Sequence, residues 1–231
     1  MNPTTATSVR PWWPRAVLFD LDGTLVDTAP DLVAAVNRLL AEEGQSPLPE
    51  AALRPLVSKG GRALLARAFP DRDGIAIEAL LPRFLAAYAG ALTRLSRPFA
   101  GIEALLAGIE SGGGRWGIVT NKPEHLARGV VAGMGWSARC AVLVGGDTLP
   151  VRKPDPAPLR HAAALLGLTT ADCVYVGDDA RDIAAGNAAG MPTAAALWGY
   201  REPVEQPEHW PASAHCVDAV AVATWIGVLP R

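Results

Sequence analysis

Two carboxylates stand two positions apart, directly after the apolar run Ala16-Val17-Leu18-Phe19. They are Asp20 and Asp22, and Gly23, which can take the positive φ of a tight turn, follows them. A carboxylate can attack phosphorus and divide hydrolysis into two easier steps through an aspartyl-phosphate. A second carboxyl group can protonate the leaving oxygen and then accept a proton from water. The alternative interpretation is an acidic turn that ends a strand.

A second acidic group follows another apolar run, 173–176, in the sequence GDDARD over 177–182. At least one of these acids could join Asp20 around a hard cation that prefers oxygen ligands, and Mg²⁺ fits best. Asp178, at the end of the run, is the first candidate. Asp179 has two open interpretations, metal binding or favourable charge near a helix N-terminus.

Polar residues that suit a phosphate follow a third apolar run. At Thr120 and Asn121, a hydroxyl and backbone N–H groups could hold phosphate oxygens. Lys153, in the sequence RKPDP, can offset the charge of a nucleophile and a phosphoryl group. Each residue alone is weak support, and it is their order along the chain that indicates phosphate chemistry.

These groups require a sheet that brings strand ends together. We expect buried strands at 16–19, 116–119 and 173–176, with further candidates at 141–144 and 193–197. Helical patterns lie between them at 101–111, 123–134, 156–167 and 180–190. Strands alternating with helices predict an α/β fold with a doubly wound, Rossmann-like parallel sheet. Ligands bind beyond the carboxyl ends of such strands, where Asp20, Thr120 and Asp178 fall.

Residues 29–97 interrupt this alternation. Apolar residues repeat at helical spacing from Leu32 to Leu40, and the segments 50–57, 61–69 and 76–89 are also helix-like. The pattern predicts a small all-helical insert after the first strand, with hinges at 27–30 and 96–101. The predicted organisation is a flexible tail over 1–14, a core of 15–28 and 98–231, and a helical domain over 29–97.

Composition favours a small-molecule partner. The net charge is −2 and there is no Lys/Arg cluster, so nothing indicates binding to nucleic acid or to an anionic membrane. No run reaches the ~18 apolar residues of a membrane helix, and the first residues lack the apolar stretch of a secretory signal. Three distant cysteines predict neither a disulfide framework nor a zinc site. We expect a cytoplasmic protein, and the sequence leaves its oligomeric state open.

Together, the segments DLDGTLVDT, VTNKP, KPDP and VGDDARD resemble the four motifs of the haloacid-dehalogenase superfamily, in the expected order. The resemblance implies a Mg²⁺-dependent phosphatase in which Asp20 is the nucleophile and a metal ligand. It implies that Asp22 is the acid/base, with its backbone carbonyl on the metal, and that Asp178 is the third ligand. Thr120 would bind phosphate and Lys153 would stabilise the charge of the phosphate. Asp182 would lie next to the metal ligands without binding the metal itself.

Within the superfamily the chain is similar to phosphoglycolate phosphatases. The segments SRPF (96–99), WGIVTNKP (116–123) and WGY (198–200) resemble the branch that acts on N-acetylmuramic acid 6-phosphate. Many phosphoglycolate phosphatases have Ser where this chain has Asp179, which favours the second branch. By the same resemblance, 29–97 is a cap that closes over the site and selects the substrate.

The cap segment 58–62, SKGGR, carries two cations in an apolar region. Lys59 and Arg62 are candidate substrate-binding residues, because a guanidinium can pair in bidentate fashion with a substrate carboxylate. The alternative is a polar loop between cap helices.

Other functions share parts of this pattern. A hydrolytic dehalogenase has no need of an acid at Asp22, because halide leaves without a proton. A β-phosphoglucomutase-like phosphotransferase would keep all four motifs, and only the cap would distinguish it. A non-catalytic phosphosugar-binding protein would be indicated by loss of Asp20 or Asp22, and both are present.

Overall fold

The computed structural model describes residues 14–228. The flexible tail predicted for residues 1–14 therefore lies outside the described residues, except for Pro14, which is buried. Within residues 14–228, no helix has the length and apolar character needed to span a bilayer.

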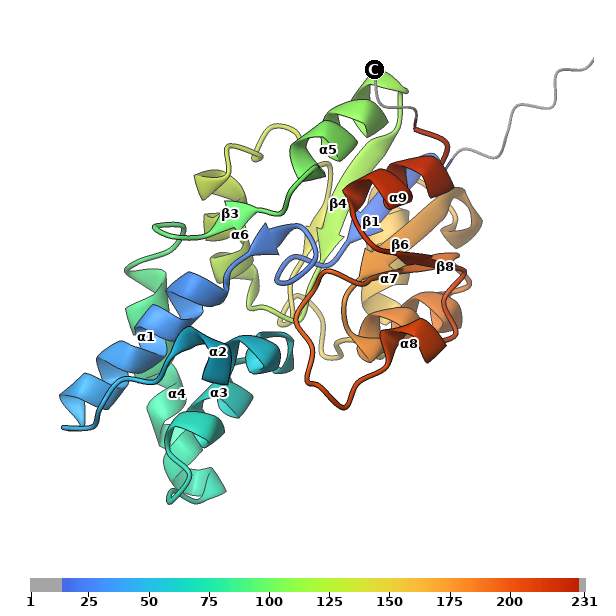
Figure 1. Cartoon of the computed structure of the whole chain (residues 1–231). Coiled ribbons are helices and arrows are strands. Elements are labelled where there is room, and N and C mark those ends of the chain that lie inside the picture. Colours follow the sequence, from blue (N-terminus) through green and yellow to red (C-terminus); the bar gives the residue numbers. More distant parts are fainter. Residues whose placement is uncertain (1–13, 229–231) are drawn as a thin grey trace, which may run out of the picture.

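A six-stranded sheet forms the centre of the fold (Figure 1). Its order is β5-β4-β1-β6-β7-β8, and every neighbouring pair is parallel. The strands are β1 (Ala16–Phe19), β4 (Arg115–Val119), β5 (Leu143–Val144), β6 (Cys173–Gly177), β7 (Thr193–Ala196) and β8 (Ala214–Cys216). The chain runs outward from β1 through β4 to β5, then returns to the other side of β1 at β6. The predicted doubly wound α/β fold is confirmed.

Alternate residues of β1 enter two different cores. Val17 and Phe19 belong to the cluster on one face, whereas Ala16 and Leu18 belong to the cluster on the other. The first face is covered by α5 (Ile102–Ser111), α6 (Glu124–Gly133) and α9 (Ala219–Trp225), and the second by α7 (Ala157–Leu165) and α8 (Ala180–Ala189). Burial on both faces explains why the strands are continuously apolar.

The segment after β1 folds into helices beside the sheet, at the blue and teal end of Figure 1. They are α1 (Ala29–Glu42), α2 (Glu50–Leu53), the 3₁₀ helix η1 (Arg54–Lys59), α3 (Gly61–Ala68) and α4 (Gly74–Ala89). They share their own apolar cluster, to which Leu126 and Tyr200 of the rest of the chain contribute. The chain enters and leaves this segment through an antiparallel ribbon of β2 (Val26–Asp27) and β3 (Arg97–Pro98). The domain boundaries themselves stay a prediction.

Several elements differ from the predicted ones. The strand expected over 141–144 is shorter, and the helix expected over 50–57 ends at Leu53 and continues as η1, whose second residue, Pro55, has no N–H to donate. The alanine-rich strand is confirmed as β7, between β6 and β8. The sequence did not indicate β8, α9, or the short 3₁₀ helices η2 (Thr170–Asp172) and η3 (Pro207–His209).

Candidate active site

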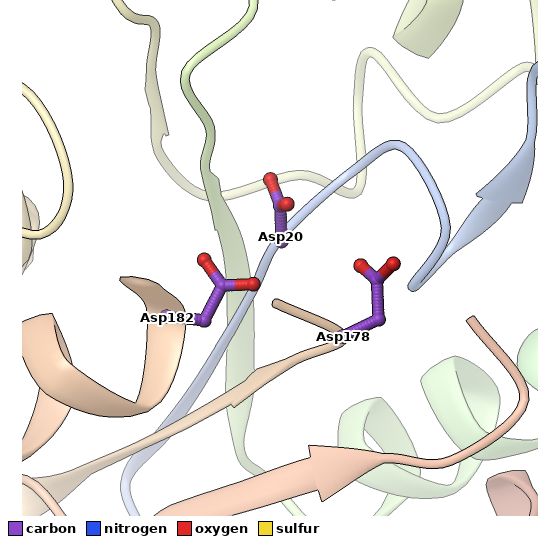
Figure 2. Close-up of side chains that lie close together, drawn as sticks. All are labelled: Asp20, Asp178 and Asp182. Atoms are coloured by element: carbon purple, nitrogen blue, oxygen red, sulfur yellow. The ribbon is translucent and has the colours of Figure 1, made fainter. Parts of the chain in front are cut away.

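Three buried carboxylates meet at the carboxyl ends of β1 and β6. Asp20, Asp178 and Asp182 each offer an oxygen, and these oxygens lie within 4.8 Å of one another. Figure 2 shows Asp20 on the segment after β1, Asp178 after β6, and Asp182 on the first turn of α8. The structure therefore brings together two acids that are distant in sequence from Asp20, as the crossover topology requires.

Asp178 is held by neighbours from three segments. Its carboxylate accepts hydrogen bonds from Thr24 Oγ1 at 2.8 Å, Ser58 Oγ at 2.8 Å and the Tyr200 backbone N–H at 3.0 Å. Gly23 has φ +85°, and a Cβ there would lie 2.2 Å from Asp178 Oδ2. The turn after Asp20 thus needs glycine both for its backbone conformation and for the space that Asp178 occupies.

Lys153 is the buried cation of the cluster. Its Nζ lies 3.0 Å from Asp20 Oδ1 and 2.6 Å from Asp182 Oδ1, and it donates to Tyr175 Oη at 2.7 Å. Burial lowers the pKa of Lys153, but Asp182 and Asp20 raise it by more, so the ammonium stays charged. The Asp20 Oδ1 atom forms its ion pair with Lys153 and has no other partner within residues 14–228.

The cluster carries more negative charge than Lys153 alone offsets. Burial, followed by repulsion from Asp20 and Asp182, raises the pKa of Asp178 well above its usual value. A divalent cation bound by carboxylate oxygens would relieve this repulsion, and Mg²⁺ prefers such hard ligands. The donor set therefore fits the predicted metal at Asp20 and Asp178, with Asp182 close enough to assist.

Asp22 has a different environment from the three clustered acids. Its carboxylate accepts from Thr28 Oγ1 at 2.6 Å and from Lys122 Nζ at 3.0 and 3.1 Å. Burial lowers the pKa of Lys122, but Asp22 and Tyr88 outweigh that effect and raise it above its usual value. Sequence reasoning did not assign a role to Lys122, although its place in VTNKP was the available signal.

The residues expected to bind phosphate line one cavity of about 270 Å³ together with Asp20, Asp22 and Lys153. Thr120 follows β4 directly, is buried, and accepts from the Lys122 backbone N–H at 3.3 Å. Asn121 Nδ2 donates to the Lys153 carbonyl at 2.9 Å, whereas Asn121 Oδ1 has no partner within residues 14–228. The core part of the predicted site is thus assembled in one place.

The two cap cations also line the cavity, but each holds a protein carboxylate. Lys59 Nζ lies 3.0 Å from Asp179 Oδ2 and 2.6 Å from Glu205 Oε1. Arg62 pairs with Glu78, and its side chain is 55% exposed. Their binding to substrate stays a prediction.

The structure assigns Asp179 two local contacts besides Lys59. Its carboxylate caps α8 by accepting from the Arg181 backbone N–H at 2.9 Å, and it pairs with the Arg181 side chain at 2.8 Å. The interpretation of Asp179 as an acid near a helix N-terminus accounts for these contacts.

Comparisons with known proteins agree with this geometry. The model of the family described as haloacid dehalogenase-like hydrolase matches residues 17–196. A phosphoglycolate phosphatase of Xylella fastidiosa is 52% identical over 200 residues, which cover 87% of each chain. An N-acetylmuramic acid 6-phosphate phosphatase of Pseudomonas aeruginosa is 44% identical over 199 residues, covering 86% of this chain and 88% of that one.

Among solved structures, the crystal structure of a predicted phosphoglycolate phosphatase from Haemophilus somnus superposes with a TM-score of 0.82. The match covers 91% of this chain and 97% of that one at 24% sequence identity, so it supports the fold alone. The family model extends from β1 to the end of β7 and includes every residue of the carboxylate cluster. The chain therefore belongs to the haloacid dehalogenase-like hydrolase family.

Proposed function

We propose that this chain is a magnesium-dependent phosphomonoester hydrolase that forms an aspartyl-phosphate on Asp20. It is a phosphatase of its family, as the names of its relatives at 44–55% identity also support. The observation that carries the proposal is that Asp20, Asp22, Thr120 and Lys153 line a single cavity beside a cluster of buried acids.

In the first step, an Asp20 carboxylate oxygen attacks phosphorus and the bond from phosphorus to the leaving oxygen breaks. Asp22 gives its proton to that oxygen, so the alcohol leaves neutral. In the second step water attacks the phosphorus of the aspartyl-phosphate, Asp22 takes the proton, and inorganic phosphate and free Asp20 are produced. The same carboxyl group thus acts first as acid and then as base.

The other residues hold the phosphoryl group in place. Thr120 and Asn121 donate to its oxygens, and Lys153 offsets its charge while Asp182 orients the ammonium. Asp20, Asp178 and the backbone carbonyl of Asp22 would hold Mg²⁺, and the ion would supply positive charge that offsets the charge of the phosphate and the carboxylates.

We infer that the substrate is a small acidic phosphate ester, either N-acetylmuramic acid 6-phosphate or 2-phosphoglycolate. Both activities occur in the names of relatives that cover more than four fifths of the chain. The proposal places the reaction in the cytoplasm, and the first of the two substrates would connect it to recycling of the cell wall.

The test is release of inorganic phosphate from p-nitrophenyl phosphate, with Mg²⁺ and after removal of metal by EDTA. We expect turnover only with Mg²⁺, and none above background in Asp20→Asn, because an amide is a far weaker nucleophile. Beryllium fluoride should attach at Asp20 as a mimic of the phosphoryl group. Full activity in Asp20→Asn would falsify the covalent route, and return of phosphate to an added sugar would indicate a phosphotransferase instead.

A further inference from the structure

The chain has three lysines, and all three line the active-site cavity. They are Lys59, Lys122 and Lys153. Lys153 pairs with the nucleophile Asp20, whereas Lys122 pairs with Asp22. Each of the two carboxylates that act in the proposed reaction therefore has a lysine of its own, and the reaction as written gives the second lysine no part.

Lys122 is held in place at both its backbone and its ammonium. Its Nζ lies 3.0 and 3.1 Å from the two Asp22 oxygens, and 4.4 Å from the centre of the Tyr88 ring on α4. The Gly146 backbone N–H donates to the Lys122 carbonyl at 2.8 Å, and the Asn121 carbonyl leaves no room for a Cβ at Gly146. The Lys122 side chain is only 5% exposed, so salt and water screen its pairing with Asp22 little.

The two oxygens of the Asp22 carboxyl group have different partners. Oδ1 accepts from Thr28 Oγ1 at 2.6 Å as well as from Lys122, whereas within residues 14–228 Oδ2 accepts from Lys122 alone. A carboxyl oxygen that carries a proton acts as a donor, so the proton belongs on the oxygen with fewer donors around it. That oxygen is Oδ2, and Lys122 keeps its contact with Oδ1 when Oδ2 is protonated.

We propose that Lys122 is a positioning residue for proton transfer: together with Thr28 it fixes the Asp22 carboxyl group so that Oδ2 delivers its proton to the leaving oxygen. The inference rests on the proposed function, in which Asp22 is the proton carrier. Orientation matters because a general acid must lie within hydrogen-bond reach of the atom that it protonates. Without Lys122, only the Thr28 side chain would hold the carboxyl group, which could then rotate.

The test is the dependence of kcat/KM on the leaving group in Lys122→Met, which removes the charge and keeps an unbranched side chain. The substrates are phenyl phosphates whose phenols differ in acidity, from phenyl phosphate to p-nitrophenyl phosphate. Nitrophenolate is a stable anion that leaves without a proton, whereas phenolate is a poorer leaving group. We expect kcat/KM to fall about ten- to a hundredfold for phenyl phosphate, part of the usual contribution of general acid catalysis, and less than about threefold for p-nitrophenyl phosphate. Because kcat/KM includes only the steps up to release of the phenol, the later attack of water does not enter the comparison.

Arg54→Met is the matched control. Arg54, on η1, pairs with Asp27 of β2 at 2.7 Å and so also connects the helical insert to the rest of the chain, but it does not line the cavity. Any loss in Arg54→Met should be the same factor for every phenyl phosphate, which is the signature of a structural role. Lys122→Gln keeps a donor beside Asp22 without the charge. It is the second variant if methionine prevents folding, and we expect a smaller effect in the same direction.

Two results would overturn the inference. One is a kcat/KM in the Lys122 variants that is unchanged, or lowered by one factor for all the phenyl phosphates, because Lys122 would then have no role or a structural one. The other is a loss confined to 2-phosphoglycolate, because Lys122 would then bind the substrate carboxylate. Both contradict the inference alone when the wild type hydrolyses p-nitrophenyl phosphate with Mg²⁺. Absence of that turnover would instead contradict the proposed function itself, and the inference with it.

Discussion

The Lys59 ammonium forms ion pairs with two acids from outside the helical insert, so its charge is already paired within the protein. It lies 3.0 Å from Asp179 and 2.6 Å from Glu205, and the preceding residue, Ser58, donates to Asp178. We predict that Lys59→Met loosens η1 from the strand ends. Because η1 helps to enclose the cavity, kcat/KM should fall for phosphomonoesters with and without a carboxylate.

The size of the effect follows from how exposed these charges are. The side chains of Lys59, Asp179 and Glu205 are 27%, 5% and 19% exposed. Exposed ion pairs contribute about 0.2–1 kcal/mol, whereas removing one partner of a fully buried pair costs about 3–5 kcal/mol. Asp179 keeps its contact with Arg181 at 2.8 Å, which limits the loss. We therefore expect about 1–2 kcal/mol, or a five- to thirtyfold fall in kcat/KM.

A double-mutant cycle with Glu205→Gln measures this directly. The assay is phosphate release from p-nitrophenyl phosphate and from 2-phosphoglycolate, in parallel. If Lys59 acts through Glu205, the single variant Glu205→Gln loses activity on both substrates, and the double variant is little worse than Lys59→Met. The reasoning is refuted if the loss in Lys59→Met is confined to 2-phosphoglycolate while Glu205→Gln behaves as wild type. Lys59 would then bind the substrate carboxylate, as the sequence predicts.

Three further predictions concern single residues. Asp178→Ala should raise the Mg²⁺ concentration needed for half-maximal turnover or abolish activity, and an unchanged metal titration would mean that Asp178 is not a ligand. Arg62→Ala should lower kcat/KM for the acidic substrate by about ten- to a hundredfold but spare p-nitrophenyl phosphate, if Arg62 exchanges Glu78 for the substrate; equal losses would exclude that role. Asp31→Asn should lower the free energy of unfolding by about 2–4 kcal/mol in a denaturant titration, because the buried Asp31 carboxylate accepts from the backbone N–H groups of Leu95 and Ser96 at 2.9 and 2.8 Å. An unchanged midpoint and slope would show that these bonds contribute little.

The parts of the fold with local signals could be predicted from the sequence. β1, β4 and β6 are buried on both faces, so their apolar runs stand out, and the polar residue after each run marks its end. β8 has no such run, because its residues Ala214, His215 and Cys216 lie at the edge of the sheet and only the last is buried. Its pairing with β7 depends on the rest of the sheet and not on its own sequence.

The residues of the site likewise divide into those that local sequence patterns predict and those that they do not. The order of the motifs predicted that Asp20, Thr120 and Asp178 would meet, because parallel strands end at one edge. The pairing of Asp22 with Lys122 joins residues from two different strand ends. The place of Lys122 in VTNKP was a signal that it matters, but neither segment by itself identifies its partner. Likewise, Tyr88 reads as one more apolar position of a helix until the structure places its ring 4.4 Å from the Lys122 ammonium. Side-chain contacts across segments are set by packing, which local patterns do not encode.

The ribbon of β2 and β3 has a consequence for how such a protein can change. It pairs Asp27 with Arg97 and Val26 with Pro98, so the helical segment leaves the sheet and returns to it at adjacent points. The residues between β2 and β3 form one long insertion whose two ends are already held together by the ribbon. Lengthening such a loop costs little free energy. The segment can therefore change in length at little cost to the sheet, but any replacement would have to supply the contacts that Ser58 and Lys59 make with Asp178 and Asp179.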